Sequence, residues 1–221
     1  MTAQLEMNFY SAQARKVAGV IAAIAFVALC VQPFLGEYGY MDNTGFLLRY
    51  FTIWGNIAGC ILLATIAFGT APPKGAMAAL ATMLTVIGTI YWGALAHLHH
   101  PVGLDRITNQ SHHTFAPIAF VFFWLRYTPR ATSTAKLIPS IMVPPLTYGA
   151  FAVVLGQMTG FYAYFFMDLS ELGWTQYLLN SAGLAAFFAV LGAVLVTIKN
   201  WLQPWLSEKL EPAPLNPTSV L

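Results

Sequence analysis

Six long apolar runs occupy most of this chain, and they constrain its fold more than any other feature of the sequence. They cover about residues 17–35, 47–68, 76–96, 113–127, 138–160 and 175–201, and a helix that crosses a bilayer needs about 20 such residues. The fourth run is shorter than the others. Strands of a membrane barrel would alternate apolar and polar residues with a period of two, and these runs do not. The sequence therefore predicts an all-α, polytopic membrane protein with six transmembrane helices.

The composition supports the same class of protein. Of the 221 residues, 58% are hydrophobic and 8% are charged, whereas soluble domains carry about 25% charged residues. Disorder needs low hydrophobicity and high net charge, and two cysteines are too few for a disulfide scaffold. A net charge of +2 without a basic run argues against a nucleic-acid partner. We expect one membrane domain over residues 1–203 and a flexible Pro-rich tail over residues 204–221.

The positive charges indicate the orientation of the helices, because Lys and Arg collect in cytoplasmic loops. With the N-terminus in the cytoplasm, eight basic residues fall on the inner side: Arg15, Lys16, Lys74, Arg126, Arg130, Lys136, Lys199 and Lys209. Only Arg49 and Arg106 fall on the outer side. We therefore expect both termini in the cytoplasm, below a cell membrane that the chain crosses several times.

This orientation also sorts the remaining polar residues. The acidic side chains of the outer side are Glu37, Asp42, Asp105, Asp168 and Glu171, and all five histidines accompany them: His97, His99, His100, His112 and His113. The inner side holds basic anchors and little else. Any chemistry that this chain performs is thus expected at the outer boundary of the membrane.

The second apolar run begins with a polar stripe. Arg49, Thr52, Asn56 and Gly59 share one face of a helix, and such a face in a membrane normally points into the protein. Thr52 lies about 4.5 Å deeper than Arg49, because a helix rises about 1.5 Å per residue. Two ordinary roles stay open here. A membrane threonine commonly bonds its own backbone, and an outer arginine commonly extends toward the headgroups.

The fourth apolar run starts at the pair His112–His113 and contains Pro117 near its start. Proline is tolerated in a first helical turn, so we expect the helix to begin at His112 or His113, with an imidazole at the depth of Thr52. Histidine moves protons near neutral pH, and a hydroxyl beside an imidazole is the minimal activated nucleophile for acyl transfer. The residues alone do not decide which histidine faces inward, or whether either one reaches Thr52.

A metal site is the main competing interpretation of the histidines. His97, His99 and His100 lie close in sequence to His112 and His113, and three or four imidazoles can bind zinc. Their spacing matches no known zinc motif, and a haem held between helices would need histidines deeper in the bilayer. A lipid-binding or transport protein without catalysis is a third class, although no run carries a charge near its centre.

An aromatic segment follows the fifth apolar run, at residues 159–168. Aromatic residues in such a place anchor a protein at the membrane interface or line the mouth of a lipid-binding cleft. Asp168 ends the segment. It is either a solvated loop acid or the acidic partner that orients a catalytic histidine.

These three segments, in this order and on six spans, resemble the androgen-induced-gene / FAR-17a-like family of integral membrane proteins and its six-span bacterial relatives. The residues that carry the resemblance, which covers residues 15–200, are Phe51, Thr52, Asn56, Asn109, His113, Pro117, Thr159, Gly160, Tyr162, Tyr164, Phe166 and Asp168. Two positions depart from the pattern. Gly55 stands where bacterial relatives often have Ser, and Phe165 stands where the family usually has Pro.

The resemblance implies a function for the chain. Animal members of the family are threonine hydrolases that cleave fatty acid esters of hydroxy fatty acids, and their nucleophile and essential histidine correspond to Thr52 and His113. The chain would then be a threonine-dependent lipid ester hydrolase of a bacterial inner membrane. It would act on a lipid of the outer leaflet without a metal or another cofactor.

A hydrolase mechanism of this kind also suggests roles for neighbouring polar residues. Arg49 would hold a substrate carboxylate, which suits a fatty acid ester with a free acid end. Asn56 and Asn180 would be candidate donors to the oxyanion of the transition state. Tyr164 and Asp168 complete the set of candidate substrate-binding or oxyanion residues.

Overall fold

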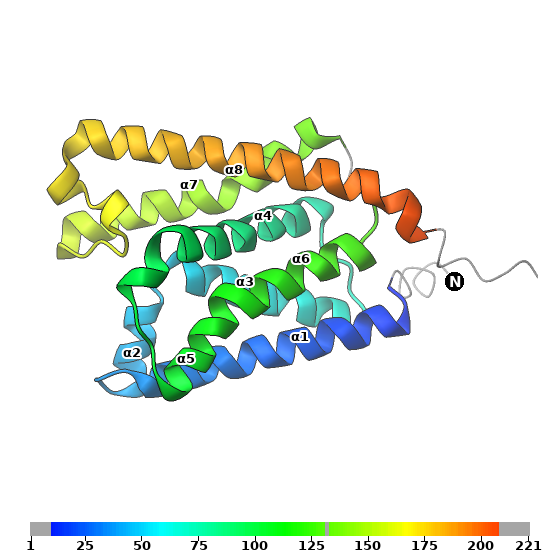
Figure 1. Ribbon diagram of the computed structural model, residues 1–221, viewed down its shortest axis with the longest axis horizontal. Helices are drawn as coiled ribbons and strands as arrows, with labels where there is room; N and C mark the ends of the chain where they lie inside the picture. The colour runs from blue at the N-terminus through cyan, green and yellow to red at the C-terminus, as the bar shows by residue number, and fades with distance from the viewer. Residues whose placement is uncertain (1–9, 131–132, 208–221) are drawn as a thin grey trace, which may run out of the picture.

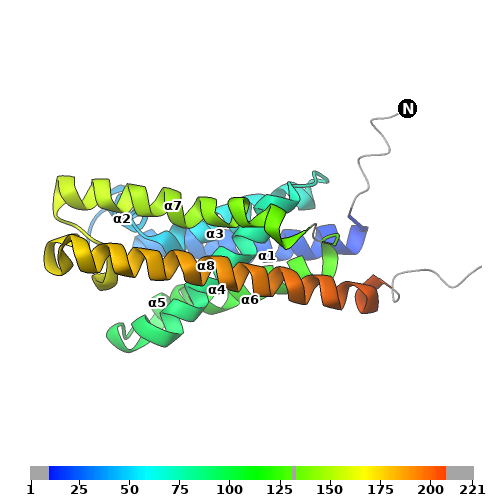
Figure 2. The same cartoon turned by 90° about the horizontal axis from the view of Figure 1, so that it is seen from above.

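The computed structural model describes residues 10–130 and 133–207, and every regular element in these ranges is helical (Figure 1). The α-helices are α1 (Ala12–Val31), α2 (Tyr40–Leu47), α3 (Phe51–Ala67), α4 (Lys74–Ile90), α5 (Gly103–Gln110), α6 (Ala116–Tyr127), α7 (Thr134–Thr159) and α8 (Leu169–Ser207). The 3-10 turns are Gln32–Leu35, Ala96–Leu98 and Phe165–Met167, and the π-turns are Tyr91–Leu95 and Ser111–Phe115. The long helices lie side by side along the length of the molecule, as the two perpendicular views show (Figures 1 and 2).

Four helical segments are long and apolar enough to cross a membrane by themselves. They are Ala12–Leu35, Lys74–Leu98, Thr134–Thr159 and Leu169–Pro204. A fifth span arises if α2 and α3, which meet at 97°, are counted together. Within the described residues the fold is thus all-α with four or five candidate spans, and each lies on one of the predicted apolar runs.

The fourth predicted run is organised differently from the expectation. The helix does not begin at His112 or His113, because α5 starts at Gly103 and the π-turn Ser111–Phe115 joins it directly to α6. In the π-turn the Ala116 N–H donates to the Ser111 carbonyl, five residues back. Pro117 follows and has no N–H with which to continue the regular ladder. The helix α6 itself has only 12 residues, too few for a membrane crossing.

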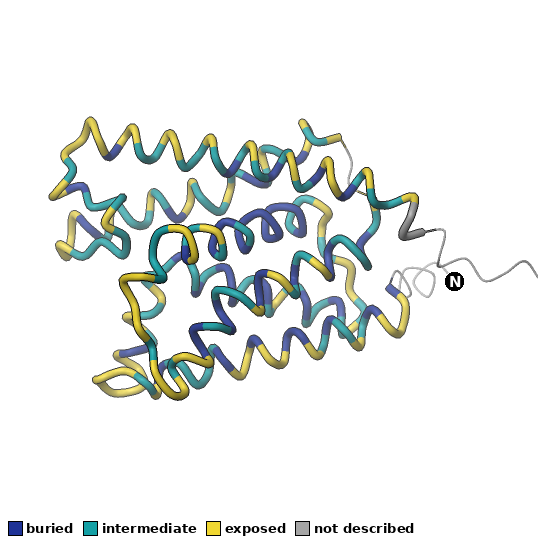
Figure 3. Tube along the Cα trace, viewed as in Figure 1, coloured by how far each residue is buried: buried dark blue, intermediate teal, exposed yellow. Residues whose placement is uncertain are grey.

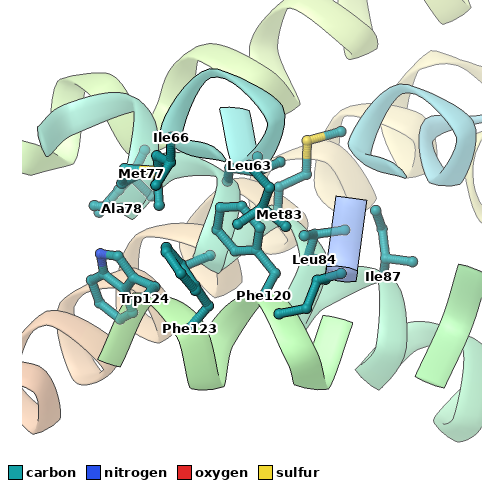
Figure 4. Packing of buried hydrophobic residues seen from close by; sticks show 14 of the residues in the cluster. Leu63, Ile66, Met77, Ala78, Met83, Leu84, Ile87, Phe120, Phe123 and Trp124 are labelled. Atoms are coloured by element: carbon teal, nitrogen blue, oxygen red, sulfur yellow. The ribbon is translucent and has the colours of Figure 1, made fainter. Parts of the chain in front are cut away.

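Several of the most deeply buried side chains lie where α3, α4 and α6 meet. Phe120 and Phe123 of α6 are fully buried against Leu63, Ile66 and Leu84 of the neighbouring helices (Figure 4). Glycines bring the backbones together, as in other membrane helix interfaces. A Cβ on Gly55 would lie 2.5 Å from the Ile87 side chain, and one on Gly59 would lie 3.5 Å from Leu84.

The helices α7 and α8 form the side of the molecule that is covered least. Most of their residues are exposed or half-buried, whereas α4 is largely buried (Figure 3). This pattern suits helices that face lipid on one side. The helix α8 continues through Pro204 to Ser207, and the rest of the predicted tail, residues 208–221, lies outside the described residues.

Candidate active site

The side chains of Thr52 and His113 lie next to each other near the start of α3. The Thr52 Oγ1 is 3.4 Å from the Nε2 of His113, a loose resting distance for a catalytic pair before substrate binds. The Nδ1 of the same ring is 3.1 Å from the Asn109 carbonyl oxygen. Because a carbonyl only accepts, Nδ1 carries the ring proton and Nε2 presents its lone pair to the Thr52 hydroxyl. His113, and not His112, is therefore the histidine that meets Thr52.

The His113 ring is held from its other side by Tyr91. The two rings are stacked with their centroids 3.9 Å apart and their planes inclined by 21°. Both residues belong to π-turns, Tyr91–Leu95 and Ser111–Phe115. Such turns frequently occur at functional sites, because the extra residue redirects a side chain. Tyr91 was not among the residues predicted from the sequence, where it is one more apolar position in the third run.

Asn56 connects the two segments that carry the pair. Its Nδ2 donates to the Thr52 carbonyl one turn back, at 2.8 Å, and to the His112 carbonyl on the other helix, at 3.1 Å. The residue is 1% exposed and lines neither cavity at the site. This predicted oxyanion candidate thus lies outside both cavities, and both of its amide protons already make hydrogen bonds to backbone carbonyls.

The first turn of α3 brings further donors to Thr52. The first helical hydrogen bonds of α3 are made by the Ile53 and Trp54 N–H groups, so those of Phe51 and Thr52 are free of the helix ladder. Tyr164 reaches this point from the aromatic segment. Burial raises the pKa of its phenol to about 12, and the nearby polar groups of Thr52 and Phe51 act to lower it. The phenol is therefore protonated at neutral pH and able to donate.

The other predicted site residues lie away from the Thr52–His113 pair. The Arg49 guanidinium sits over the rings of Phe46 and Phe161, 5.7 and 5.2 Å from their centroids. The Asn180 amide donates to the Phe166 carbonyl at 2.9 Å and so attaches the aromatic segment to α8.

Asp168 has a local role in the structure. Its Oδ1 accepts from the backbone N–H and hydroxyl of Ser170 and from the Glu171 N–H. This is the hydrogen bonding of an acidic cap at the start of α8. The group that orients His113 is instead the Asn109 carbonyl, which the sequence did not indicate because every residue has one.

Two cavities meet at the pair. The first, called the apolar cavity, has a volume of about 410 Å³ and is lined by Val86, Ile87, Ile90, Leu146, Leu178 and Phe188 among others. The second, called the polar cavity, has a volume of about 630 Å³, and its lining includes Gln32, Asn43, His99, Asp105, Asn109 and His112. The two share Thr52, Tyr91, Leu95, His113 and Tyr164. Both volumes are typical of ligand sites, which span about 300–1,000 Å³.

The histidines do not assemble a metal centre in the part of the chain that the structure describes. No group of three or more His, Cys, Asp or Glu side chains converges there. His99 instead pairs with Asp105, with the Nε2 and Oδ2 atoms 3.6 Å apart. Thr52 and His113 form a contact between a hydroxyl and an imidazole, and the other ring nitrogen of that imidazole is bonded to the Asn109 carbonyl.

No protein-family model, curated protein or solved structure matches this chain. The chemistry open to the chain is therefore inferred from the groups at this site. They are an alcohol in contact with a neutral imidazole, backbone and phenol donors beside it, and a cavity on each side.

Replacing Asn56 by leucine should destabilise the protein measurably. The buried His112 carbonyl would lose this donor, and the Thr52 carbonyl would lose the second of its two bonds, at a cost of about 1–3 kcal/mol. We expect Asn56→Leu to lower the Tm of the detergent-solubilised protein in a fluorescence melt. The matched control is Thr89→Ala, which removes an exposed hydroxyl bonded to the Thr85 carbonyl and should change stability by less than about 0.5 kcal/mol. Equal Tm values for the two variants would show that Asn56 does not hold the site together.

Proposed function

We propose that this protein is an intramembrane hydrolase of lipid esters, with Thr52 as nucleophile and His113 as general base. The observation that carries the proposal is the 3.4 Å contact between Thr52 Oγ1 and His113 Nε2 at the junction of two cavities. A long-chain acyl group suits the apolar cavity. Fatty acid esters of hydroxy fatty acids, which the family resemblance suggests, or a related lipid ester are the proposed substrates.

The reaction follows from the positions of the two side chains. His113 Nε2 takes the proton of the Thr52 hydroxyl as Oγ1 attacks the ester carbonyl, and the resulting tetrahedral intermediate collapses. The alcohol leaves with the proton from Nε2, and the acyl group stays on Thr52. A water molecule, deprotonated by the same imidazole, then attacks the acyl carbonyl. The fatty acid is released, and Oγ1 recovers its proton from His113.

The developing oxyanion needs donors close to Thr52. The Tyr164 hydroxyl and the N–H groups at the start of α3 lie there, and a helix N-terminus favours negative charge. Each such donor contributes about 3–4 kcal/mol to a transition state of this kind. Asn56 and Asn180 are engaged elsewhere, so we assign the oxyanion site to Tyr164 and the Thr52 backbone.

We further propose six membrane spans with both termini in the cytoplasm of a bacterial inner membrane and the site toward the outer face. The continuous helical stretch 103–127 would supply the crossing that α6 is too short to make. The start of α1 and the end of α8 lie at the same end of the molecule, opposite α2 and α5 (Figure 1), as an even number of crossings requires. Lipid would enter sideways, along the sparsely covered α7 and α8.

An active-site-directed fluorophosphonate tests the nucleophile directly. The purified protein should be labelled, Thr52→Ala should not be labelled, and Thr52→Ser should retain labelling because it keeps the hydroxyl. His113→Gln should slow ester hydrolysis by about 10²–10⁴-fold, which is the usual effect of losing a general base. Labelling is read by gel fluorescence, and hydrolysis by release of fatty acid from a long-chain ester.

The matched control for His113 is His97→Gln, because His97 is exposed and lines neither cavity. This variant should keep wild-type labelling and turnover. Undiminished hydrolysis in Thr52→Ala would rule out the nucleophile. A wild-type protein that binds lipid esters in both cavities without cleaving them would instead be a lipid-binding or transport protein.

Tyr164→Phe tests the oxyanion assignment. The change keeps the ring in the aromatic segment and removes only the hydroxyl, so kcat should fall about 10²–10³-fold with a much smaller change in KM. The control is Tyr162→Phe, whose hydroxyl accepts from Gln157 on α7 and lies in neither cavity lining. If the two variants lose activity equally, the hydroxyl of Tyr164 has no special part in the reaction.

A further inference from the structure

Three of the residues that line the polar cavity carry buried hydrogen-bonding atoms that nothing in the described protein satisfies. Both ring nitrogens of His112, the Oε1 of Gln32 and the Oδ1 of Asn109 are buried and have no partner among the described residues. His112 is 3% exposed and Asn109 is 7% exposed, and all three side chains line this cavity. Further buried atoms without a partner lie elsewhere in the described protein, at Asn56, Ser111 and Ser181 among others, but four such atoms belong to residues that line this one cavity. Buried polar atoms without partners destabilise a fold, so this grouping points to a ligand that bonds them.

The chemistry of these atoms defines what the ligand must offer. The amide oxygens of Gln32 and Asn109 only accept hydrogen bonds, and a neutral imidazole such as His112 accepts at one nitrogen and donates at the other. A ligand that satisfies them must therefore carry several donors. Hydroxyl groups fit best, because each one donates and accepts.

The charges around the polar cavity argue against an anionic ligand. No Lys or Arg is found among the described residues that line it, and the Arg49 guanidinium is stacked over Phe46 and Phe161 outside the lining. Asp105, which does line it, accepts from Gln32 Nε2 at 2.9 Å and pairs with His99. A carboxylate bound here would lie near a negative charge without a cation, which is costly in a partly buried site.

We propose that the polar cavity binds the alcohol half of the substrate, and that this half is a neutral group with several hydroxyls, such as glycerol. The proposal rests on the hydrolase function above and specifies its substrate as a fatty acyl ester of a polyol. The acyl chain lies in the apolar cavity, the ester carbonyl lies at Thr52, and the free hydroxyls bond His112, Gln32 and Asn109. An ester whose alcohol half ends in a carboxylate fits this cavity less well.

Three palmitate esters test the proposal on the full-length protein in detergent micelles. They are glycerol monopalmitate, the same ester with both free hydroxyls methylated, and the palmitate ester of hydroxystearic acid. The methylated ester keeps the ester bond and the glycerol skeleton, but a methyl group replaces each hydroxyl hydrogen, so it can accept hydrogen bonds and cannot donate them. We expect kcat/KM for glycerol monopalmitate to exceed that of each other ester at least about tenfold, which corresponds to about 1.4 kcal/mol.

The variants His112→Leu and Gln32→Met probe the cavity itself. Each should reduce the preference for the free over the methylated glycerol ester to about threefold or less, because each removes acceptors for the hydroxyls. His100→Leu is the control. This exposed loop histidine lines neither cavity, so the preference should stay as in the wild type.

The possible outcomes separate this proposal from the hydrolase function. Equal hydrolysis of the free and methylated esters, or a preference for the hydroxystearate ester, would overturn the polyol assignment and leave the hydrolase intact. Hydrolysis of no ester would overturn the hydrolase function. In that case, the ligand is identified by adding each of the same lipids to the Thr52→Ala variant and measuring the change in its Tm. A larger shift with glycerol monopalmitate than with its methylated form supports the polyol site, and equal shifts exclude it.

Discussion

The contact between Thr52 and His113 depends on a single buried amide that joins the two helices carrying them. Asn56 bonds the backbone carbonyls of Thr52 and His112 together, and Tyr91 and the Asn109 carbonyl then fix the His113 ring between them. In a bilayer there is no water to replace such bonds, so a polar group between helices destabilises the fold unless it has a hydrogen-bond partner in the protein. The amide therefore orients the pair and also completes the packing of α3 against the π-turn.

The position of the pair explains how one site can serve two unlike halves of a lipid. On one side, α4, α7 and α8 provide an almost entirely apolar wall. On the other side, the 3-10 turn Gln32–Leu35, α2 and α5 provide amides and a carboxylate, and the loop at His99 and the π-turn Ser111–Phe115 provide imidazoles. Both walls end at the same hydroxyl and imidazole. A lipid ester has the same division, with an apolar chain and a polar group joined at the bond to be cleaved.

Much of the architecture could be predicted from the sequence, because membrane helices are selected by long apolar runs. The inward position of the polar stripe was predictable for Asn56 and Gly59, which are buried, but not for Arg49, which precedes α3 at the bend after α2 and does not share its face. The start of the helix before His113 was not predicted. The α5 segment is polar and exposed on one side, so it has no apolar run to mark it, and a π-turn has no sequence signature beyond the nearby Pro117.

The contacts within the site were harder to predict for a related reason. Whether His112 or His113 meets Thr52 depends on the extra residue in the Ser111–Phe115 π-turn, which rotates the helix between its two ends. Tyr91 stands in an apolar run and gives no sign that it stacks on an imidazole. Asn56 and Asp168 were recognised as polar residues worth naming, but all but one of their hydrogen-bond partners are backbone groups, which are the same at every position.

Capture of the acyl-enzyme tests the central claim most directly. The protein would be mixed rapidly with a long-chain ester, quenched in acid within the first turnover, digested and analysed by peptide mass spectrometry. A threonine nucleophile predicts the acyl mass on the peptide that contains Thr52, with fragmentation assigning it to that side chain. Recovery of the acyl group on a different residue would contradict the account.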